Sequence, residues 1–269
     1  MYFRILGTVQ GEAAGRQITF GWRQERQALG ILLIEAGHAV PTGRLMQLMW
    51  GETIPRNGRG ALQSVLSRLR KSLSAFDHEG SALALNRRGD GYELAVPREQ
   101  VDLHAFRALM AEAHGATDPE TGISLIRAGL GLWRGPALAD ATDDNLDTVV
   151  TSLEEERISA QEHLIELLLR MGRNHEVIPE LIRLIADRPE RERLHGQLLL
   201  ALHRSGRRLE ALEAYQRLRR TLADDFGLTP SGDLQQLHWQ ILDSDRSDGL
   251  TTESRQAQPR RPEYGSVLA

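Results

Sequence analysis

The sequence predicts a mixed α+β unit over residues 1–97, an all-α unit over residues 98–243 and a disordered tail over residues 244–269. Short stretches that alternate apolar and polar residues, typical of strands, occur only in the first unit. From residue 101 onward the apolar residues follow helical spacing, and a set of residues recurs there at a fixed interval. The tail is rich in Ser, Thr, Gln, Pro and Arg, a composition that favours disorder.

Composition excludes several classes of protein. The chain has 269 residues, of which 26% are charged and none is cysteine. That length allows two domains, and the lack of cysteine excludes disulfides, thiolate metal sites and a cysteine nucleophile. The longest mostly apolar run, Ala28–Ile34, is too short to span a membrane, and the N-terminus lacks the layout of a signal peptide. We therefore expect a cytoplasmic protein with no membrane partner.

The two units differ in charge. Residues 1–96 hold 12 basic and 8 acidic side chains, whereas residues 97–269 hold 21 basic and 29 acidic ones. The net charges are therefore +4 and −8, consistent with −4 for the whole chain. Because a positive surface attracts polyanions, any anion-binding role is expected in the first unit.

The first unit is expected to begin with a small sheet and two helices. Strand Tyr2–Val9 alternates in hydrophobicity, and Ile18–Phe20 is predicted to pair with it in antiparallel fashion. Apolar residues at helical spacing then predict a helix over Arg23–Ala36. Thr42 is expected to cap a second, shorter helix that ends at Trp50.

A third helix, predicted over Asn57–Lys71 with the asparagine as its cap, has two very different faces. Its apolar face is formed by Leu62, Val65, Leu66, Leu69 and Leu73. The opposite face and its flanks hold small, amide and basic side chains and no acid: Gly60, Gln63, Ser64, Ser67, Arg68, Arg70 and Lys71. Such side chains allow a helix to approach a polyanion closely. Taken alone, however, a charged pattern of this kind is more often a solvated helix face.

A basic hairpin changes that interpretation. Strands are predicted over Ala82–Leu85 and Tyr92–Val96, and the connection Asn86–Gly91 contains residues that favour a turn, with Arg87 and Arg88 at its tip. A sheet, three helices and a basic hairpin are the parts of a winged helix-turn-helix. In that fold the third helix enters the major groove of double-stranded DNA and the wing lies on the backbone or in the minor groove.

The second unit is predicted to be helical throughout. Helices are expected to begin at Asp102, which would cap the first of them, at Pro119 and near Thr148. A repeat of 34 residues follows, the length of a tetratricopeptide hairpin. Leu164, Leu168, Gly172, Arg173 and Glu176 recur as Leu198, Leu202, Gly206, Arg207 and Glu210. Stacked helical hairpins of this kind present a surface for protein partners.

Nothing in the sequence predicts an enzyme. The nine histidines include no His-Glu-x-x-His spacing, and no Gly-x-Ser-x-Gly occurs. The acidic run Asp243–Gly249 departs from a calcium loop because its glycine comes one position late and the distal Glu is misplaced. We therefore predict no catalytic residue, no cofactor and no metal site.

Read as a whole, the chain resembles the Streptomyces antibiotic regulatory protein family of transcriptional activators over about residues 1–243. The order and spacing of several short motifs carry the resemblance. In the first unit they are Leu48–Gly51, Leu62–Leu73 and Arg88–Tyr92, and in the second Leu132–Leu138, Ala201–Arg207, Glu210–Tyr215 and Phe226–Pro230. The larger relatives continue into an ATPase domain, but no Gly-x-x-x-x-Gly-Lys-[Ser/Thr] occurs here, so the resemblance is to the small form.

The resemblance implies an OmpR-type winged helix joined to a bacterial transcriptional activation domain. It implies a nucleoid-associated activator that binds short direct repeats near promoters of antibiotic biosynthetic clusters and recruits RNA polymerase holoenzyme. The positions that match the family's groove-facing residues are Gln63, Ser64, Ser67, Arg68 and Lys71, with Arg70 toward phosphate and Arg87 and Arg88 in the wing. Trp50 matches a residue near the DNA backbone, although a core position suits it equally well.

Three questions stay open at this point. The entry Gly58–Gly60 is more glycine-rich than the family pattern, which leaves the N-terminal register of the third helix unassigned. On DNA, direct repeats favour tandem copies, whereas inverted sites require a homodimer. The alternative function is a tetratricopeptide-like interaction scaffold whose winged helix does not bind DNA.

Overall fold

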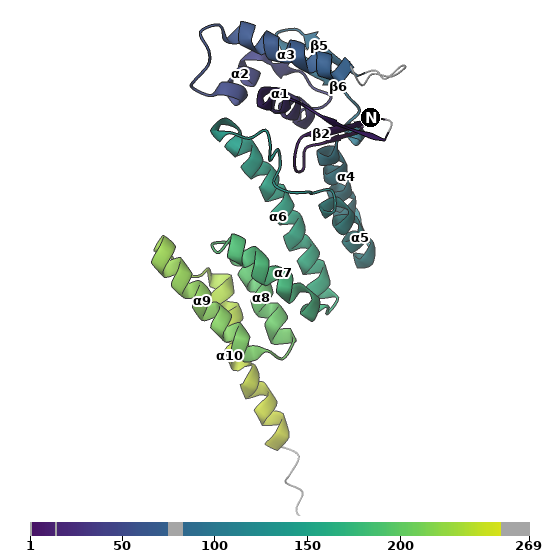
Figure 1. Cartoon of the computed structure of the whole chain (residues 1–269). Coiled ribbons are helices and arrows are strands. Elements are labelled where there is room, and N and C mark those ends of the chain that lie inside the picture. The colour runs from purple at the N-terminus through teal and green to yellow at the C-terminus, as the bar shows by residue number, and fades with distance from the viewer. Residues whose placement is uncertain (1, 14, 75–82, 254–269) are drawn as a thin grey trace, which may run out of the picture. The chain divides into compact units, whose positions relative to one another are not determined.

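The computed structural model describes residues 2–13, 15–74 and 83–253 of the chain (Figure 1). The chain divides into two compact units, Met1–Leu167 and Leu168–Ala269. The first compact unit runs past residue 97 because the segments that follow are hydrogen-bonded to the N-terminal strands, as described below. The domain boundary expected after residue 97 stays a prediction.

An antiparallel sheet of three strands opens the first unit. β1 (Tyr2–Arg4), β2 (Gln10–Ala13) and β3 (Arg16–Thr19) lie in the order β1-β2-β3, with Phe3 opposite Gly11 and Gly11 opposite Ile18. The predicted long strand Tyr2–Val9 is wrong. The strand ends at Arg4 because the next two amides donate hydrogen bonds to a carboxylate instead of to a neighbouring strand.

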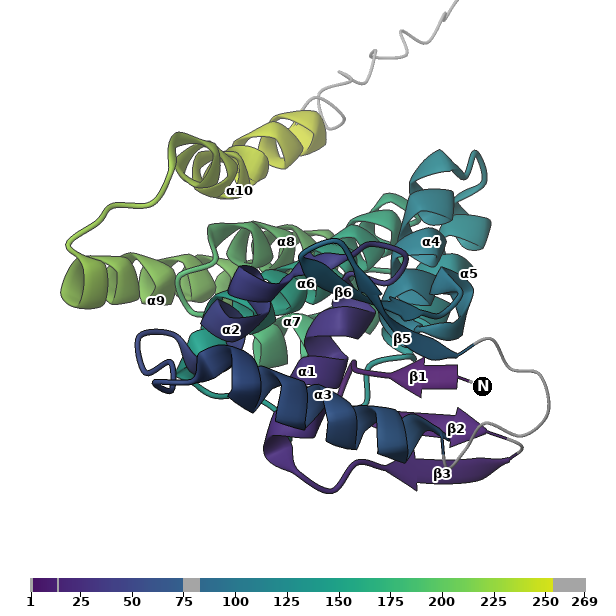
Figure 2. The ribbon, with the colours of Figure 1, turned by 90° about the horizontal axis from the view of Figure 1, so that it is seen from above.

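The three predicted helices of this unit are confirmed. They are α1 (Arg23–Ile34), α2 (Thr42–Trp50) and α3 (Gly58–Ser74), and α3 packs against both of the others (Figure 2). Their apolar faces form a core in which each of the following side chains is at most 1% exposed: Leu29, Leu32, Leu45, Leu62, Val65, Leu66 and Leu69. This burial leaves the opposite side of α3 facing outward.

The wing is a hairpin held to the start of α2. β4 (Val40–Pro41), β6 (Gly91–Ala95) and β5 (Ala84–Arg88) form an antiparallel sheet in the order β4-β6-β5. Thr42 does not cap α2 as predicted, because its hydroxyl and its amide both donate to the Asp90 carbonyl, at 2.6 and 2.9 Å. Ala82, where the first strand of this hairpin was expected to begin, lies outside the described residues.

Helices follow the wing. After the short η1 (Arg98–Gln100), α4 (Asp102–Gly115) and α5 (Pro119–Leu130) pack side by side, and η2 (Asp144–Leu146) leads into α6 (Asp147–Arg170). Asp118 caps α5 by accepting a hydrogen bond from the Thr121 amide at 2.9 Å.

The second unit holds most of the predicted repeat, whose first residue, Leu164, lies in α6. It contains α7 (Asn174–Asp187), α8 (Glu192–Arg204), α9 (Arg208–Phe226) and α10 (Gly232–Glu253). The two repeat glycines, Gly172 and Gly206, have φ of +74° and +75°, so each makes the same left-handed turn into the next helix. α10 runs past Ser244, where the tail was expected to begin, and residues 254–269 lie outside the described part.

Candidate nucleic-acid interface

The entry to α3 explains its unusual glycines. The Asn57 side chain caps the helix by accepting a hydrogen bond from the Gly60 amide at 3.1 Å, as predicted. A Cβ on Gly58 would lie 2.7 Å from Ile54 Cγ2 and 3.3 Å from Met46 Sδ, and a Cβ on Gly60 would lie 2.5 Å from Asn57 Nδ2. The glycines therefore permit close packing at the helix start, and the register that the sequence left open is set with α3 beginning at Gly58.

The residues predicted to face the groove and Arg70, predicted to face phosphate, share one exposed surface of α3. Gln63, Ser64, Ser67, Arg68, Arg70 and Lys71 are all exposed, whereas the leucines and the valine between them are buried. The Ser64 hydroxyl donates to the Gly60 carbonyl at 3.0 Å, so it is already used within the helix. The face carries three cations and no acid, which makes it a positive surface on a rigid element.

Two of the arginines are held by neighbouring elements. Arg68 Nε lies 3.2 Å from Glu25 Oε1 on α1. Arg70 Nε donates to the Leu85 carbonyl of β5 at 3.1 Å, and its guanidinium carbon lies 5.9 Å from the centre of the Tyr92 ring. Arg70 thus connects the exposed face of α3 to the strands of the wing.

The wing arginines lie in a different place from the one predicted. Arg87 and Arg88 are the last residues of β5, opposite Tyr92 and Gly91, and only Gly89 and Asp90 form the turn. The turn is this short because Gly89 adopts φ +57°, which lets two residues reverse the chain. Both arginines remain exposed, and Arg88 forms an ion pair with Glu93 at 2.9 Å that solvent screens.

The structure adds Arg59 to the exposed face of α3 and excludes Trp50 from it. Arg59, in the first turn of α3, is exposed four residues before Gln63 and so lies on the same face. That spacing was visible in the sequence but was obscured by the flanking glycines. Trp50 is only 8% exposed and belongs to the core, so its alternative place near a DNA backbone is wrong. Within the described residues, the side chains of Lys71 and Arg87 form no ion pair and no hydrogen bond, although the Lys71 carbonyl accepts from the Ser74 hydroxyl at 3.1 Å.

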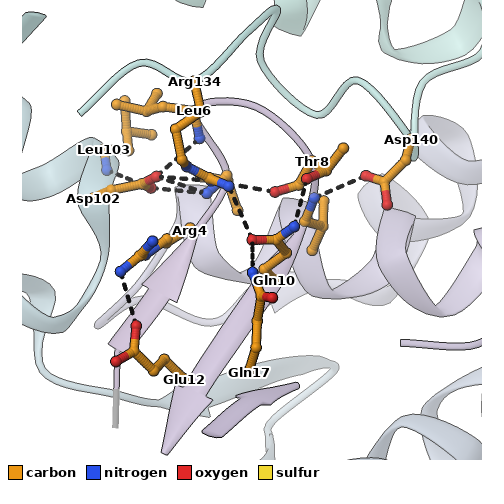
Figure 3. Close-up of polar contacts among 12 residues, drawn as sticks. Arg4, Leu6, Thr8, Gln10, Glu12, Gln17, Asp102, Leu103, Arg134 and Asp140 are labelled. Atoms are coloured by element: carbon orange, nitrogen blue, oxygen red, sulfur yellow. Dashed lines mark hydrogen bonds and ion pairs between the residues drawn. The ribbon is translucent and has the colours of Figure 1, made fainter. Parts of the chain in front are cut away.

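A second polar cluster lies on the sheet of the first unit (Figure 3). The Asp102 carboxylate, 1% exposed, accepts hydrogen bonds from the amides of Ile5, Leu6 and Leu103 at 2.8, 3.0 and 2.9 Å. The prediction that Asp102 caps α4 is wrong: Asp102 is the first residue of the helix, Val101 occupies the N-cap position, and the carboxylate accepts from these three amides instead. Burial raises the pKa of Asp102, and the backbone hydrogen bonds and Arg134, whose Nη2 lies 3.6 Å away, partly counter that rise.

The segment after α5 continues this attachment along the chain. The Arg134 amide donates to the Leu6 carbonyl at 2.8 Å, and the Leu138 amide donates to the Ile5 carbonyl at 2.9 Å. Asp140 accepts from the Val9 amide at 2.8 Å (Figure 3) and forms an ion pair with Arg26 of α1 at 3.0 Å. These bonds join the winged helix to the segments that follow it, so that both belong to the first compact unit.

The described residues hold no group of three or more His, Asp or Glu side chains that suits a metal ion. Nor is any described helix long and apolar enough to cross a membrane.

Known proteins resemble the chain across both units. The bacterial transcriptional activator domain matches residues 101–242. The regulatory protein DnrI of Streptomyces peucetius is 35% identical over 253 residues, which cover 91% of this chain and 93% of DnrI. The regulatory protein AfsR of Streptomyces griseus is 36% identical, but the match covers 90% of this chain and only 24% of AfsR. The structure of Mycobacterium tuberculosis EmbR in complex with a low-affinity phosphopeptide is similar with a TM-score of 0.82 at 32% identity, covering 94% of this chain and 69% of EmbR.

Proposed function

The chain belongs to the Streptomyces antibiotic regulatory protein family of transcriptional activators, and from this premise we propose that it binds double-stranded DNA through α3 and the β5–β6 wing. The observation that carries the proposal is the acid-free, exposed face of α3 beside two exposed arginines of β5. A helix presented in this way, with its apolar side buried against two other helices, fits the major groove.

The side chains divide by the contacts they suit. Gln63 and Arg68 are assigned to base edges because amide and guanidinium groups match the donors and acceptors of adenine and guanine, and Ser67 because its hydroxyl can pair with either base. Arg70 of α3 and Arg87 and Arg88 of β5 are assigned to phosphates, where their charges give affinity without sequence information. Lys71, which the resemblance places among the groove-facing residues, is assigned to a phosphate at the groove edge because its ammonium is a point charge on a flexible stem. Ser64 is assigned to the same surface as a small residue that permits close approach.

The finer role follows the family. We infer that the sites are short direct repeats near promoters of an antibiotic biosynthetic cluster, and that the bound protein recruits RNA polymerase holoenzyme. The helical hairpins of the second unit support the recruiting role, because stacked hairpins expose an extended surface to a protein partner. Direct repeats favour tandem copies over a two-fold homodimer. A scaffold without DNA binding is the competing function, and DNA binding decides between them.

The test is the salt dependence of duplex binding, measured by fluorescence anisotropy from low to moderate salt. Each phosphate contact contributes about −0.9 to the slope of log affinity against log salt. We expect a steep slope for the wild-type chain. The magnitude of the slope should fall by about one in Lys71→Ala and, separately, by about one in Arg87→Ala. Arg219→Ala, which removes an exposed arginine of α9, is the matched control and should leave the slope unchanged. A flat salt dependence of the wild-type chain would contradict DNA binding.

A further inference from the structure

Glu25 is an unexpected residue to find beneath a DNA-binding surface. It lies on α1 and is only 3% exposed, and its carboxylate faces α3. Oε1 lies 3.2 Å from Arg68 Nε, and Oε2 accepts a hydrogen bond from the Ser72 hydroxyl at 3.4 Å. One carboxylate therefore contacts two residues of α3 that lie one turn apart, and one of them is the arginine assigned to base contact.

We propose that Glu25 is a positioning residue for base recognition. Glu25 stays paired with Arg68 on DNA and holds the arginine in the orientation that reads a guanine. The proposal rests on the proposed function and deepens it. It assigns sequence discrimination partly to a residue of α1 that never touches DNA.

The pairing geometry leaves the reading group of Arg68 available. The shortest contact with Glu25 is made by Nε, the guanidinium nitrogen nearest the backbone. The two terminal nitrogens, Nη1 and Nη2, are the fork that reaches O6 and N7 of guanine in an end-on approach. The Arg68 side chain is 44% exposed while that of Glu25 is 4% exposed, so the pair runs from the core of the unit to its surface.

The burial of Glu25 argues that the pair persists on DNA. If DNA drew Arg68 away, the carboxylate would keep, among the residues that the structure describes, only the long contact from Ser72. A buried carboxylate without its cation is strongly destabilising. Keeping the pair has no such cost, and it restricts a long side chain that would otherwise lose its freedom on binding. The contact between Glu25 and Arg68 therefore favours an arginine that is oriented in advance for DNA over an arginine that Glu25 keeps away from DNA.

The test uses the full chain, a duplex obtained by selection from random DNA, and a scrambled duplex of equal length. Arg68→Ala should bind the selected duplex about ten- to a hundredfold more weakly and lose discrimination at one base pair. Glu25→Gln, which keeps the shape and removes the charge, should bind it about three- to tenfold more weakly and lose discrimination at that same base pair. The double variant should bind no more weakly than Arg68→Ala, because both changes act on one contact.

Two controls separate positioning from other effects. Glu52→Gln removes an exposed acid from the loop before α3 and should leave base discrimination intact. Affinity for the scrambled duplex should be unchanged in Glu25→Gln, whereas a merely structural defect would weaken both duplexes alike. If Glu25→Gln loses the native circular dichroism spectrum, Glu25→Asp replaces it, and its discrimination should fall at the same base pair.

Unchanged or tighter binding of the selected duplex by Glu25→Gln would overturn the inference and indicate that Glu25 withholds Arg68. Additive losses in the double variant would overturn it as well. If the wild-type chain bound no duplex in a salt-dependent way, the proposed function itself would fail, and this result is distinguishable from the other two.

Discussion

Replacing Asp102 with alanine should destabilise the first unit more than any surface substitution. The change removes the acceptor of three buried amides, those of Ile5, Leu6 and Leu103. An unsatisfied buried amide costs about 1–3 kcal/mol, and removal of a carboxylate that is itself costly to bury offsets part of the sum. We expect a net loss of about 3–5 kcal/mol in the free energy of unfolding.

The measurement is urea denaturation followed by circular dichroism at neutral pH. Asp102→Asn keeps one acceptor oxygen and should lose about half as much, roughly 1–3 kcal/mol. Asp224→Ala, which removes an exposed carboxylate of α9, is the control and should leave the midpoint unchanged. If Asp102→Ala unfolded at the same urea concentration as the Asp224 control, the structural role assigned to the cluster would be refuted.

Two further predictions concern the second unit and the entry to α3. Burial lowers the pKa of His195, which is 7% exposed and whose Nε2 lies 2.9 Å from the Pro189 carbonyl oxygen. The stability that the neutral His195 contributes is therefore present above the ordinary histidine pKa of about 6.5 and is lost as pH falls through the lowered value. The free energy of unfolding of His195→Gln should consequently depend less on pH between pH 7 and 5 than that of the wild-type chain. An unchanged pH dependence would contradict the role assigned to His195. Gly58→Ala should cost about 1 kcal/mol through its contact with Ile54, whereas Gly43→Ala in α2, with nothing within 4 Å of its Cβ, should be neutral or stabilising. Thermal unfolding of both variants checks the difference in sign.

Local patterns predicted most of the fold. The three helices of the winged helix follow from apolar spacing, and the stop and turn glycines, including Gly172 and Gly206, mark where helices end. The hairpin was also predictable from local patterns, because its strands and its turn lie next to each other in the sequence. The exact ends of the two strands were not predictable, because the two-residue turn between them depends on the φ of Gly89.

Contacts between distant residues escaped prediction. Asp102 has the sequence pattern of a helix cap, and nothing near it indicates that two of its partners are Ile5 and Leu6. The N-terminal strand was predicted too long for the same reason, since that carboxylate takes its amides. Glu25, in the first turn of a helix, has the pattern of a surface acid and gives no local sign of burial. The exposed face of α3 was predictable because it depends only on helical spacing, whereas the anchoring of its arginines depends on α1 and β5.

The central claim is that α3 and the wing read duplex DNA, and selection from a random duplex pool by the purified chain tests it most directly. We predict that repeated rounds enrich a short motif that occurs twice in the same orientation, with centres about one helical turn apart. Lys71→Ala should enrich the same motif at lower yield, and Arg68→Ala should enrich a motif relaxed at one position. A pool that stays random after selection with the wild-type chain would contradict the account.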